Sequence, residues 1–355
     1  MRVLEIGPSP YRSKGGMATV LREIEADKDM CSRFHIEIYD SYIDGSRLTV
    51  LLYSVFAFLR FYFTKRDFDI YHIHAASYGS TFRKGWYVSA AKRWGKKVVL
   101  HVHGAAYLVF YEQLSAGKKA RVRSIWEKCD TVIALSEDWK SRFQKIFHSR
   151  NIVAVNNGIH AEQFEEARCD TASCRNCFLL LGRLGKRKGA YDVVEAVESI
   201  RTEFPAVKVY MAGDGEVEEL RSVVEKKKLG RYIDIVGWAD FSRKLGLMKE
   251  CGTILLPSYH EGLPMTILEG MAAGKVIIST DVGGIPEVVQ DGYNGIIIRP
   301  GDIEALGAAM KRVMTDESFD AACSEHNRDK IQREFSSRIM HQRLADIFME
   351  FEDGI

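Results

Sequence analysis

Residues 255–286 read LLPSYHEGLPMTILEGMAAGKVIISTDVGGIP, and this stretch decides the fold of the chain. It begins inside an apolar run that predicts a buried strand of a parallel sheet. A polar loop follows at 258–262, and the apolar spacing of residues 265–273 then predicts a helix. Pro264 suits the first helical position and Gly274 suits the helix end. This order places helix-start N–H groups at the carboxyl edge of a sheet, where α/β proteins bind phosphates.

Two carboxylates frame this turn, with Glu261 in the loop before the helix and Glu269 inside the helix. A carboxylate beside a phosphate is unfavourable unless it serves hydroxyl groups, because like charges repel. The pair therefore indicates a ligand with sugars on both sides of a diphosphate. The alternative is that Glu261 caps the helix and Glu269 lies on a solvated face, and the spacing alone leaves both interpretations open.

A second phosphate-binding pattern follows a predicted strand at 178–181. Residues 182–189 read GRLGKRKG and precede a helix predicted over 190–201. Arg183 can donate two parallel hydrogen bonds to phosphate oxygens, and Lys188 can neutralise another oxygen. A basic surface loop is the competing interpretation of this stretch.

A third loop of this kind lies near the N-terminus, between a predicted strand at 2–6 and a helix predicted over 17–26. It ends in Gly15 and Gly16, which let the backbone approach an anion closely. The loop matches neither the dinucleotide-binding fingerprint nor the P-loop.

These motifs together resemble the retaining glycosyltransferases of the GT-B fold, family 4, also called glycosyl transferases group 1. Glu261-Gly262-Leu263-Pro264, with Glu269 eight positions after Glu261, is similar to the E-x7-E motif of that family, and 182–189 match its G-R-x4-K-G pattern. The resemblance implies an α/β fold of two Rossmann-like, doubly wound domains that face each other across a cleft. The expected division is an acceptor-side domain at 1–165, a nucleotide-sugar-binding domain at 166–335, and a helix at 336–355 that returns to the first domain.

The resemblance also implies roles for single residues. Glu261 would hold hydroxyls of the transferred hexose, and Arg183 and Lys188 would clamp the donor diphosphate. His103, which follows a strand predicted at 97–101, would face the transferred sugar, and Glu269 would bind the ribose hydroxyls. The other positions implied in donor binding are Gly15, Gly16, Gly213, Gly237, Trp238, Gly262, Leu263, Pro264, Met265 and Thr266.

No metal and no other cofactor is expected. Asp-x-Asp occurs at 27–29 and 67–69, but neither copy follows the carboxyl end of a predicted strand, where a donor's metal would be held. Arg183, Lys188 and the helix-start amides would instead stabilise the charge of the leaving diphosphate.

The implied function is transfer of a hexose-type sugar, with retention of configuration, from a nucleoside-diphosphate donor to a saccharide or lipid-linked saccharide. UDP is favoured because it is the commoner base in such families, and the setting would be polysaccharide or glycoconjugate assembly. One alternative is a GT-B nucleotide-sugar 2-epimerase, which needs acids on both sides of the cleft. The sequence Gly104-Ala105-Ala106 after His103 offers none. The other alternative is an inactive nucleotide-sugar-binding module, against which the intact motifs argue.

Charge is distributed unevenly along the 355 residues. The net charge of +2 combines +8 in residues 1–165 with −6 in the remainder. Residues 83–128 hold 11 basic and two acidic side chains, interleaved with Trp86, Tyr87, Trp94 and Tyr107. Such a face indicates an anionic membrane surface or nucleic acid, and the membrane is preferred because no nucleic-acid recognition motif is present.

Targeting signals are not evident in the sequence. The apolar residues 48–63 are interrupted by Arg60 and are shorter than the roughly 20 residues of a membrane span, so a buried or interfacial helix is predicted. The start of the chain lacks a cleavage-site pattern. The expected location is the cytoplasm, with a peripheral position at the inner face of the membrane left open.

The cysteines predict no metal site. Their number, seven, and the lack of an export signal indicate reduced thiols. Cys174 and Cys177 form a C-x-x-C, with Cys169 and His160 as conceivable further ligands. A zinc site usually has a second tight pair, which the sequence lacks, so an accidental spacing near the inter-domain linker is preferred.

Overall fold

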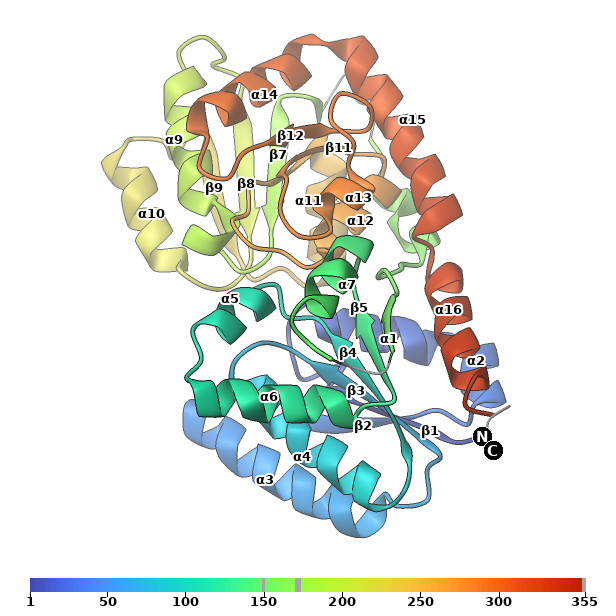
Figure 1. Cartoon of the computed structure of the whole chain (residues 1–355). Coiled ribbons are helices and arrows are strands. Elements are labelled where there is room, and N and C mark those ends of the chain that lie inside the picture. The colour runs from blue at the N-terminus through green and yellow to red at the C-terminus, as the bar shows by residue number, and fades with distance from the viewer. Residues whose placement is uncertain (149–150, 170–173, 353–355) are drawn as a thin grey trace. The chain divides into compact units, whose positions relative to one another are not determined.

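The computed structural model describes residues 1–148, 151–169 and 174–352 of the chain (Figure 1). The chain forms two compact units, Met1–Gly158 with Ser337–Ile355, and Ile159–Ser336. Each unit is built around a six-stranded parallel sheet.

The sheet of the first unit has the strand order β2-β1-β3-β4-β5-β6, so its direction of growth reverses between β1 and β3. Ligands of open α/β sheets bind beyond the carboxyl ends of the strands at such a reversal. The strands are β1 (Val3–Pro8), β2 (Glu37–Tyr42), β3 (Ile70–Ala75), β4 (Lys97–Val102), β5 (Thr131–Ala134) and β6 (Ile152–Ala154). The helices are α1 (Gly16–Ala26), α2 (Lys28–Arg33), α3 (Arg47–Thr64), α4 (Gly79–Arg93), α5 (Tyr107–Glu112), α6 (Ala116–Lys128), α7 (Glu137–Gln144) and α16 (Ser337–Met349).

The two faces of this sheet differ in chemistry. Alternate residues of β1, β3 and β4 point to one face, where Leu4, Tyr71 and Leu100 pack in one apolar core with Phe61 of α3 and Trp126 of α6. On the opposite face the same strands carry Glu5, His72, His74 and His101, which are fully buried beside apolar residues such as Val3 and Val99.

The last helix of the chain, α16, packs in the first unit beside α1 and α2 (Figure 1). Phe348 lies edge-on to Phe34, with ring centroids 5.4 Å apart, and 5.7 Å from the ring of His72. His341 Nδ1 lies 2.6 Å from Asp27 Oδ2, and Asp27 also caps α2 by accepting the N–H of Met30. The first Asp of 27–29 therefore has a structural role.

Helix α3 is exposed over most of its length. Only Ser54, Ala57 and Phe61 are fully buried, and Tyr53, Phe58 and Tyr62 are half-buried against the core. Among the described residues it is the one helix long and apolar enough to cross a membrane, judged by length and composition alone. The exposed apolar residues are Leu48, Leu51, Leu52, Val55, Phe56, Leu59 and Phe63.

The sheet of the second unit has the order β12-β11-β10-β7-β8-β9, which is the Rossmann order when its strands are renumbered along the chain. Its reversal lies between β7 and β10. The strands are β7 (Cys177–Leu181), β8 (Lys208–Ala212), β9 (Ile233–Gly237), β10 (Thr253–Leu256), β11 (Val276–Thr280) and β12 (Ile296–Ile298). The α-helices are α9 (Ala190–Ile200), α10 (Val217–Lys226), α11 (Phe241–Glu250), α12 (Met265–Ala272), α13 (Ile285–Val288), α14 (Ile303–Thr315) and α15 (Glu317–Glu334), and two 3-10 helices are η1 (Ala161–Ala167) and η2 (Lys186–Lys188).

The predicted fold class is confirmed, because both sheets are parallel and follow doubly wound orders. Two local predictions are wrong. Pro264 is the N-cap of α12 and not its first helical residue, since its ψ of 123° is extended. Residues 161–176 are polar overall and lack periodicity, which predicts an inter-domain linker, but 161–167 form η1, because Ala161, Phe164 and Ala167 are apolar at a spacing of three and are buried together.

Candidate functional site

The reversal point of the second sheet brings the two predicted phosphate-binding loops together. The loop 182–189 leaves β7 and the loop 257–264 leaves β10, and the Tyr259 N–H donates to the carbonyl of Arg187 over 2.9 Å. The loop after β8, residues 213–216, joins them, because the Leu184 N–H donates to the carbonyl of Asp214 over 2.6 Å. Gly213 permits this contact, since a Cβ there would lie 1.7 Å from the carbonyl oxygen of Gly182.

Glu261 and Lys188 form a buried ion pair at this point. Lys188 Nζ lies 2.6 Å from Glu261 Oε1, and the hydroxyl of Ser258 donates to the same oxygen over 2.8 Å. Arg187 Nη1 is 3.6 Å from that oxygen and donates to the carbonyl of His260 over 2.9 Å. Lys188, predicted to bind the diphosphate, and Glu261, predicted to bind the hexose hydroxyls, therefore contact each other directly.

Arg183 differs from Lys188 in its surroundings. Its side chain is exposed, and no carboxylate in the described parts of the chain lies within ion-pair distance of it. A guanidinium without an internal partner can give both of its parallel N–H groups to an external anion.

Glu269 is held by a residue that the sequence reasoning missed. Lys244 Nζ lies 2.6 Å from Glu269 Oε1, and the carboxylate is buried. The ammonium also lies over the rings of Phe164 and Phe241, at 5.4 and 5.1 Å from their centroids. The spacing of Lys244 on α11 carries no motif that could have revealed this pairing. Glu269 is thus not a solvated face residue, and Glu261 does not cap α12, whose N-cap is Pro264.

The start of α12 is shaped by backbone contacts. The Gly284 N–H donates to the carbonyl of Gly262 over 2.6 Å, and a Cβ on Gly283 would lie 2.1 Å from the carbonyl oxygen of Glu261. No side chain caps this helix. Five residues of this turn are predicted to bind the donor. Thr266 is half-buried, and the others, Gly262, Leu263, Pro264 and Met265, are buried.

The remaining predicted positions fall at strand ends and at a helix start. Gly237 ends β9 with a φ of +79°, and Trp238 follows it with 53% of its surface exposed. In the first unit, Gly15 is the N-cap of α1 and Gly16 is its first residue. A Cβ on Gly15 would meet no atom within 4 Å, so the space beside this turn is open to a ligand.

His103 follows β4 in the first unit, and one of its ring nitrogens contacts a buried histidine. Its Nε2 lies 2.9 Å from Nδ1 of the buried His74, whose Nε2 lies 2.8 Å from Glu5 Oε2. Burial lowers the pKa of His103 to about 3, so this histidine is neutral at physiological pH. His103 was predicted from the sequence, whereas its contacts with His74 and, through it, Glu5 were not.

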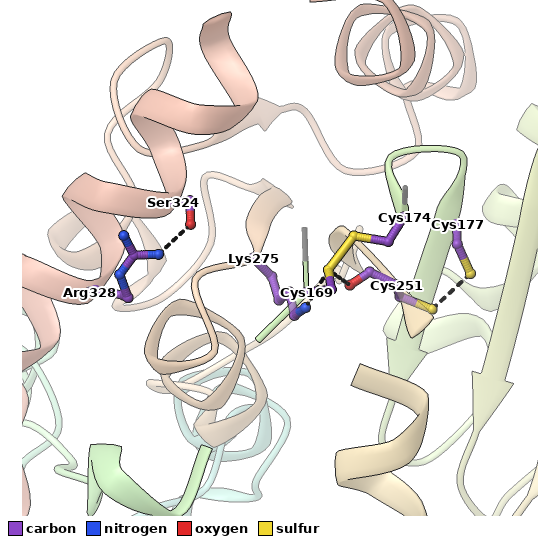
Figure 2. The surroundings of a disulfide bond; sticks show 7 residues. All are labelled: Cys169, Cys174, Cys177, Cys251, Lys275, Ser324 and Arg328. Atoms are coloured by element: carbon purple, nitrogen blue, oxygen red, sulfur yellow. Dashed lines mark hydrogen bonds between the residues drawn. A yellow bond between two sulfur atoms is a disulfide. The ribbon is translucent and has the colours of Figure 1, made fainter. Parts of the chain in front are cut away.

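The cysteines are arranged differently from the prediction (Figure 2). Cys169 and Cys174 form a disulfide, so the expectation of reduced thiols is wrong for this pair. Cys177 does not join Cys174, and its Sγ lies 2.9 Å from Sγ of Cys251. The buried Lys275 donates to Cys169 Sγ over 3.0 Å, and Cys169 Sγ lies 3.7 Å from the carbonyl oxygen of Cys251.

The second Asp-x-Asp also has a structural role. Asp69 accepts the N–H of Arg2 over 2.8 Å and lies 3.8 Å from Lys96 Nζ. In the described parts of the chain, His72, His74 and His101 are the residues grouped closely enough to hold a metal ion, with ligand atoms within 4.8 Å of one another. They lie in the first unit and belong to neither Asp-x-Asp.

Two parallel-sheet units, one with a basic loop and an acid pair at its reversal point, define the GT-B class of folds. Solved structures agree over the whole chain. A sucrose-phosphate synthase from Thermosynechococcus elongatus superimposes with a TM-score of 0.81 at 18% identity, covering 100% of both chains. HepE from Anabaena, in complex with UDP-glucose, superimposes with a TM-score of 0.78 at 17% identity, covering 99% of this chain and 100% of that one.

The chain belongs to the glycosyltransferases described by two family models. The model for glycosyl transferases group 1 matches residues 162–330, and the model for glycosyltransferase family 4 matches residues 19–163.

Curated relatives agree with this assignment at low identity. An uncharacterised glycosyltransferase of Methanocaldococcus jannaschii is 24% identical over 341 residues, which is 90% of both chains. The glycogen synthase of Mycobacterium tuberculosis is 25% identical over 228 residues, 63% of this chain and 55% of that relative. A putative colanic acid biosynthesis glycosyltransferase of Escherichia coli is 25% identical over 236 residues, 63% and 58% of the two chains. The chain thus spans about half the length of the glycogen synthase that it matches.

Proposed function

We propose that this protein transfers a hexose-type sugar from a UDP-sugar to a saccharide or lipid-linked saccharide, with retention of configuration and without a metal ion. The observation that carries the proposal is the buried contact between Lys188 and Glu261 at the reversal point, beside the uncapped start of α12. HepE has been solved in complex with UDP and with UDP-glucose, which supports a uridine donor.

In this proposal the site exchanges one set of charge contacts for another when the donor binds. Arg183 and Lys188 approach the diphosphate, and the helix-start amides of α12 add hydrogen-bond donors to it. Glu261, no longer the only partner of Lys188, accepts hydrogen bonds from hexose hydroxyls. Glu269, already oriented by Lys244, accepts them from the ribose.

The proposed reaction breaks the bond between the anomeric carbon and the diphosphate oxygen while the acceptor oxygen attacks from the same face. The acceptor proton moves to a diphosphate oxygen, so no side chain needs to act as a covalent nucleophile. New negative charge grows on the leaving diphosphate, and fixed cations there lower the barrier. A divalent ion is unnecessary in this scheme because Arg183 and Lys188 supply the positive charge.

The deciding experiment measures free nucleoside diphosphate released from UDP-, GDP- and ADP-sugars, with and without saccharide acceptors and in the presence of EDTA. We expect acceptor-dependent release of UDP that EDTA does not reduce. A 2-epimerase would change the sugar without acceptor dependence, and an inactive module would bind nucleotide without release. Release abolished by EDTA and restored by Mg²⁺ would contradict the metal-free scheme.

A peripheral membrane location at the cytoplasmic face is part of the proposal, and the surface of α3 supports it. The exposed apolar face of this helix borders a groove of about 420 Å³ between α3, α4 and α6. Apolar side chains line it, and the cations Arg93, Arg121 and Lys128 lie at it without a carboxylate partner among the described residues. Apolar surface beside unpaired cations suits acyl chains and anionic headgroups. Because Phe61 is buried in the domain core, α3 is proposed to lie on the membrane and not to span it.

A further inference from the structure

A row of ionisable side chains crosses the first sheet on the face opposite to its apolar core. Glu5 of β1 is paired in register with His72 of β3, and His74 of β3 is paired with His101 of β4. These four side chains are fully buried. His103 continues the row at the carboxyl end of β4 and is half-buried.

Glu5 connects the row into two branches. In the first, Glu5 Oε2 lies 2.8 Å from His74 Nε2, and His74 Nδ1 lies 2.9 Å from His103 Nε2. In the second, His72 Nδ1 lies 2.8 Å from the same Oε2 and 3.0 Å from Oε1 of Glu5, and His72 Nε2 lies 3.2 Å from His101 Nδ1. The second branch ends at His101 Nε2, which is buried without a hydrogen-bond partner among the described residues.

The proton positions along the first branch follow from hydrogen-bond logic. A carboxylate carries no proton, so Glu5 accepts and His74 Nε2 must donate. His74 is neutral, because burial lowers its pKa well below the ordinary value, so its Nδ1 has only a lone pair. His103 Nε2 must then donate to that lone pair. A neutral His103 therefore has its own lone pair at Nδ1, and no described residue donates a hydrogen bond to that atom.

We propose that Glu5 and His74 are positioning residues that fix His103 in the Nε2–H tautomer, so that its Nδ1 accepts a hydrogen bond from a hydroxyl of the bound sugar. The identity of that ligand rests on the proposed function, whereas the tautomer does not. A wrong tautomer would present an N–H to the same hydroxyl and would disturb the orientation of the sugar. The inference thus extends the site from one histidine at the end of β4 to a buried acid on β1, two strands away in the sheet.

A metal ion is the competing explanation for this row, since the ligand atoms of His72, His74 and His101 lie within 4.8 Å of one another. The hydrogen-bond network already engages both nitrogens of His72 and of His74. A metal would have to replace these contacts. The network leaves one buried nitrogen unexplained, at His101, which is not on the branch that reaches His103.

The first test needs no activity and no damaging substitution. The ¹⁵N resonances of histidine-labelled protein distinguish a protonated ring nitrogen from one with a lone pair, and His103→Gln assigns the signals of His103. We expect a protonated Nε2 and an unprotonated Nδ1 across neutral pH. A protonated Nδ1 in the unmodified protein, or one equivalent of transition metal found in the purified chain, would overturn the proposal.

The second test separates positioning from packing. His74→Phe removes both nitrogens of the branch and preserves a ring, while His72→Phe makes the same change at an equally buried site that does not contact His103. We expect His74→Phe to mix the tautomers of His103 and to lower kcat/KM about tenfold, the scale of one oriented hydrogen bond. His72→Phe should leave the tautomer of His103 unchanged. Equal effects of the two variants on the His103 tautomer and on kcat/KM would show a merely structural role and overturn the proposal. Absence of any nucleotide release would count against the proposed function and would leave the tautomer result unaffected.

Discussion

Lys188 and Glu261 follow different strands of the second sheet, yet their charged atoms lie 2.6 Å apart in a largely buried position. A buried ion pair adds little net stability, because removing both charges from water offsets their attraction. Retaining such a pair at a reversal point is therefore better explained by a ligand than by folding. Removing one partner leaves the other charge uncompensated, so substitutions here must be judged together with a measurement of folding.

We expect Glu261→Ala and Lys188→Ala each to lower kcat at least about 100-fold, the scale for removing a positioned electrostatic partner. The measurement is the initial rate of UDP release under saturating donor. Lys186→Ala is the matched control, since Lys186 is an exposed lysine of the same loop. Melting temperatures of all three variants check folding. Rates near that of the unmodified protein in both Glu261→Ala and Lys188→Ala would contradict the assigned roles.

Asp320 of α15 predicts a pH dependence of stability. Its side chain is buried, neither carboxyl oxygen has a hydrogen-bond partner in the described structure, and burial raises its pKa from 3.8 to about 6 against the opposing charges of Arg175 and Lys275. The folded state thus holds this proton more tightly than the unfolded state. The contribution of Asp320 to stability is present below pH 4 and is lost as the pH rises through 6.

Asp320→Asn should therefore raise the free energy of unfolding by about 2 kcal/mol at pH 8, where the native carboxyl is ionised, and by little at pH 4. Urea unfolding at the two pH values measures the difference. Asp329→Asn, an exposed acid of the same helix in an i,i+4 pair with Arg333, should give no such dependence on pH. An equal effect of Asp320→Asn at both pH values would show that its carboxyl is not titrating in this range.

The residue scale shows what sequence reasoning can identify. Glu261, Lys188 and His103 were predicted because motifs at strand ends constrain which residue types can meet a ligand. Ser258, the partner of Glu261, was missed, as were Lys244, the partner of Glu269, and His74 and Glu5 behind His103. Their roles depend on which side chains meet across neighbouring loops and strands, and tertiary packing decides that.

At the scale of elements, long periodic segments were predicted well and their ends less well. The helix predicted over 48–63 is α3, Arg47–Thr64, whereas η1 was missed in a polar stretch without a clear period. Periodicity shows that α3 is apolar on nearly every side. It cannot show which side is left uncovered, because that depends on the neighbouring helices.

The uncovered face of α3 gives a prediction about membranes. We expect the double variant Leu52→Glu with Phe56→Glu to reduce binding to vesicles containing phosphatidylserine at least about tenfold, since both side chains are exposed and a buried charge at this surface is unfavourable. Co-sedimentation at low salt measures binding. Lys226→Glu changes the net charge equally on α10 of the second unit and should have little effect. Unchanged binding of the double variant would contradict a role for α3.

At the scale of the whole molecule, the chain leaves the first unit after Gly158 and returns to it at Ser337. The first unit therefore contains both ends of the chain, and α16 completes its sheet face with Phe348. Two units with separate cores, each held largely by its own contacts, are expected to unfold in separable steps. A ligand that binds one unit raises the midpoint of that step alone.

Because UDP is proposed to bind the loop 182–189 and the start of α12, it is expected to mark the unfolding step of the second unit. Phe348→Ala removes a fully buried ring from the first unit. It should lower the free energy of unfolding of the UDP-insensitive step by about 3–5 kcal/mol. Leu306 is a fully buried residue of α14, and Leu306→Ala should instead lower the free energy of unfolding of the step whose midpoint UDP raises. Calorimetry with and without UDP distinguishes the two, because each substitution should affect one peak and UDP should move only the second. If Phe348→Ala weakened the UDP-sensitive step as strongly as Leu306→Ala does, the units would fold as one, and the separation of nucleotide binding from the first unit would have to be abandoned.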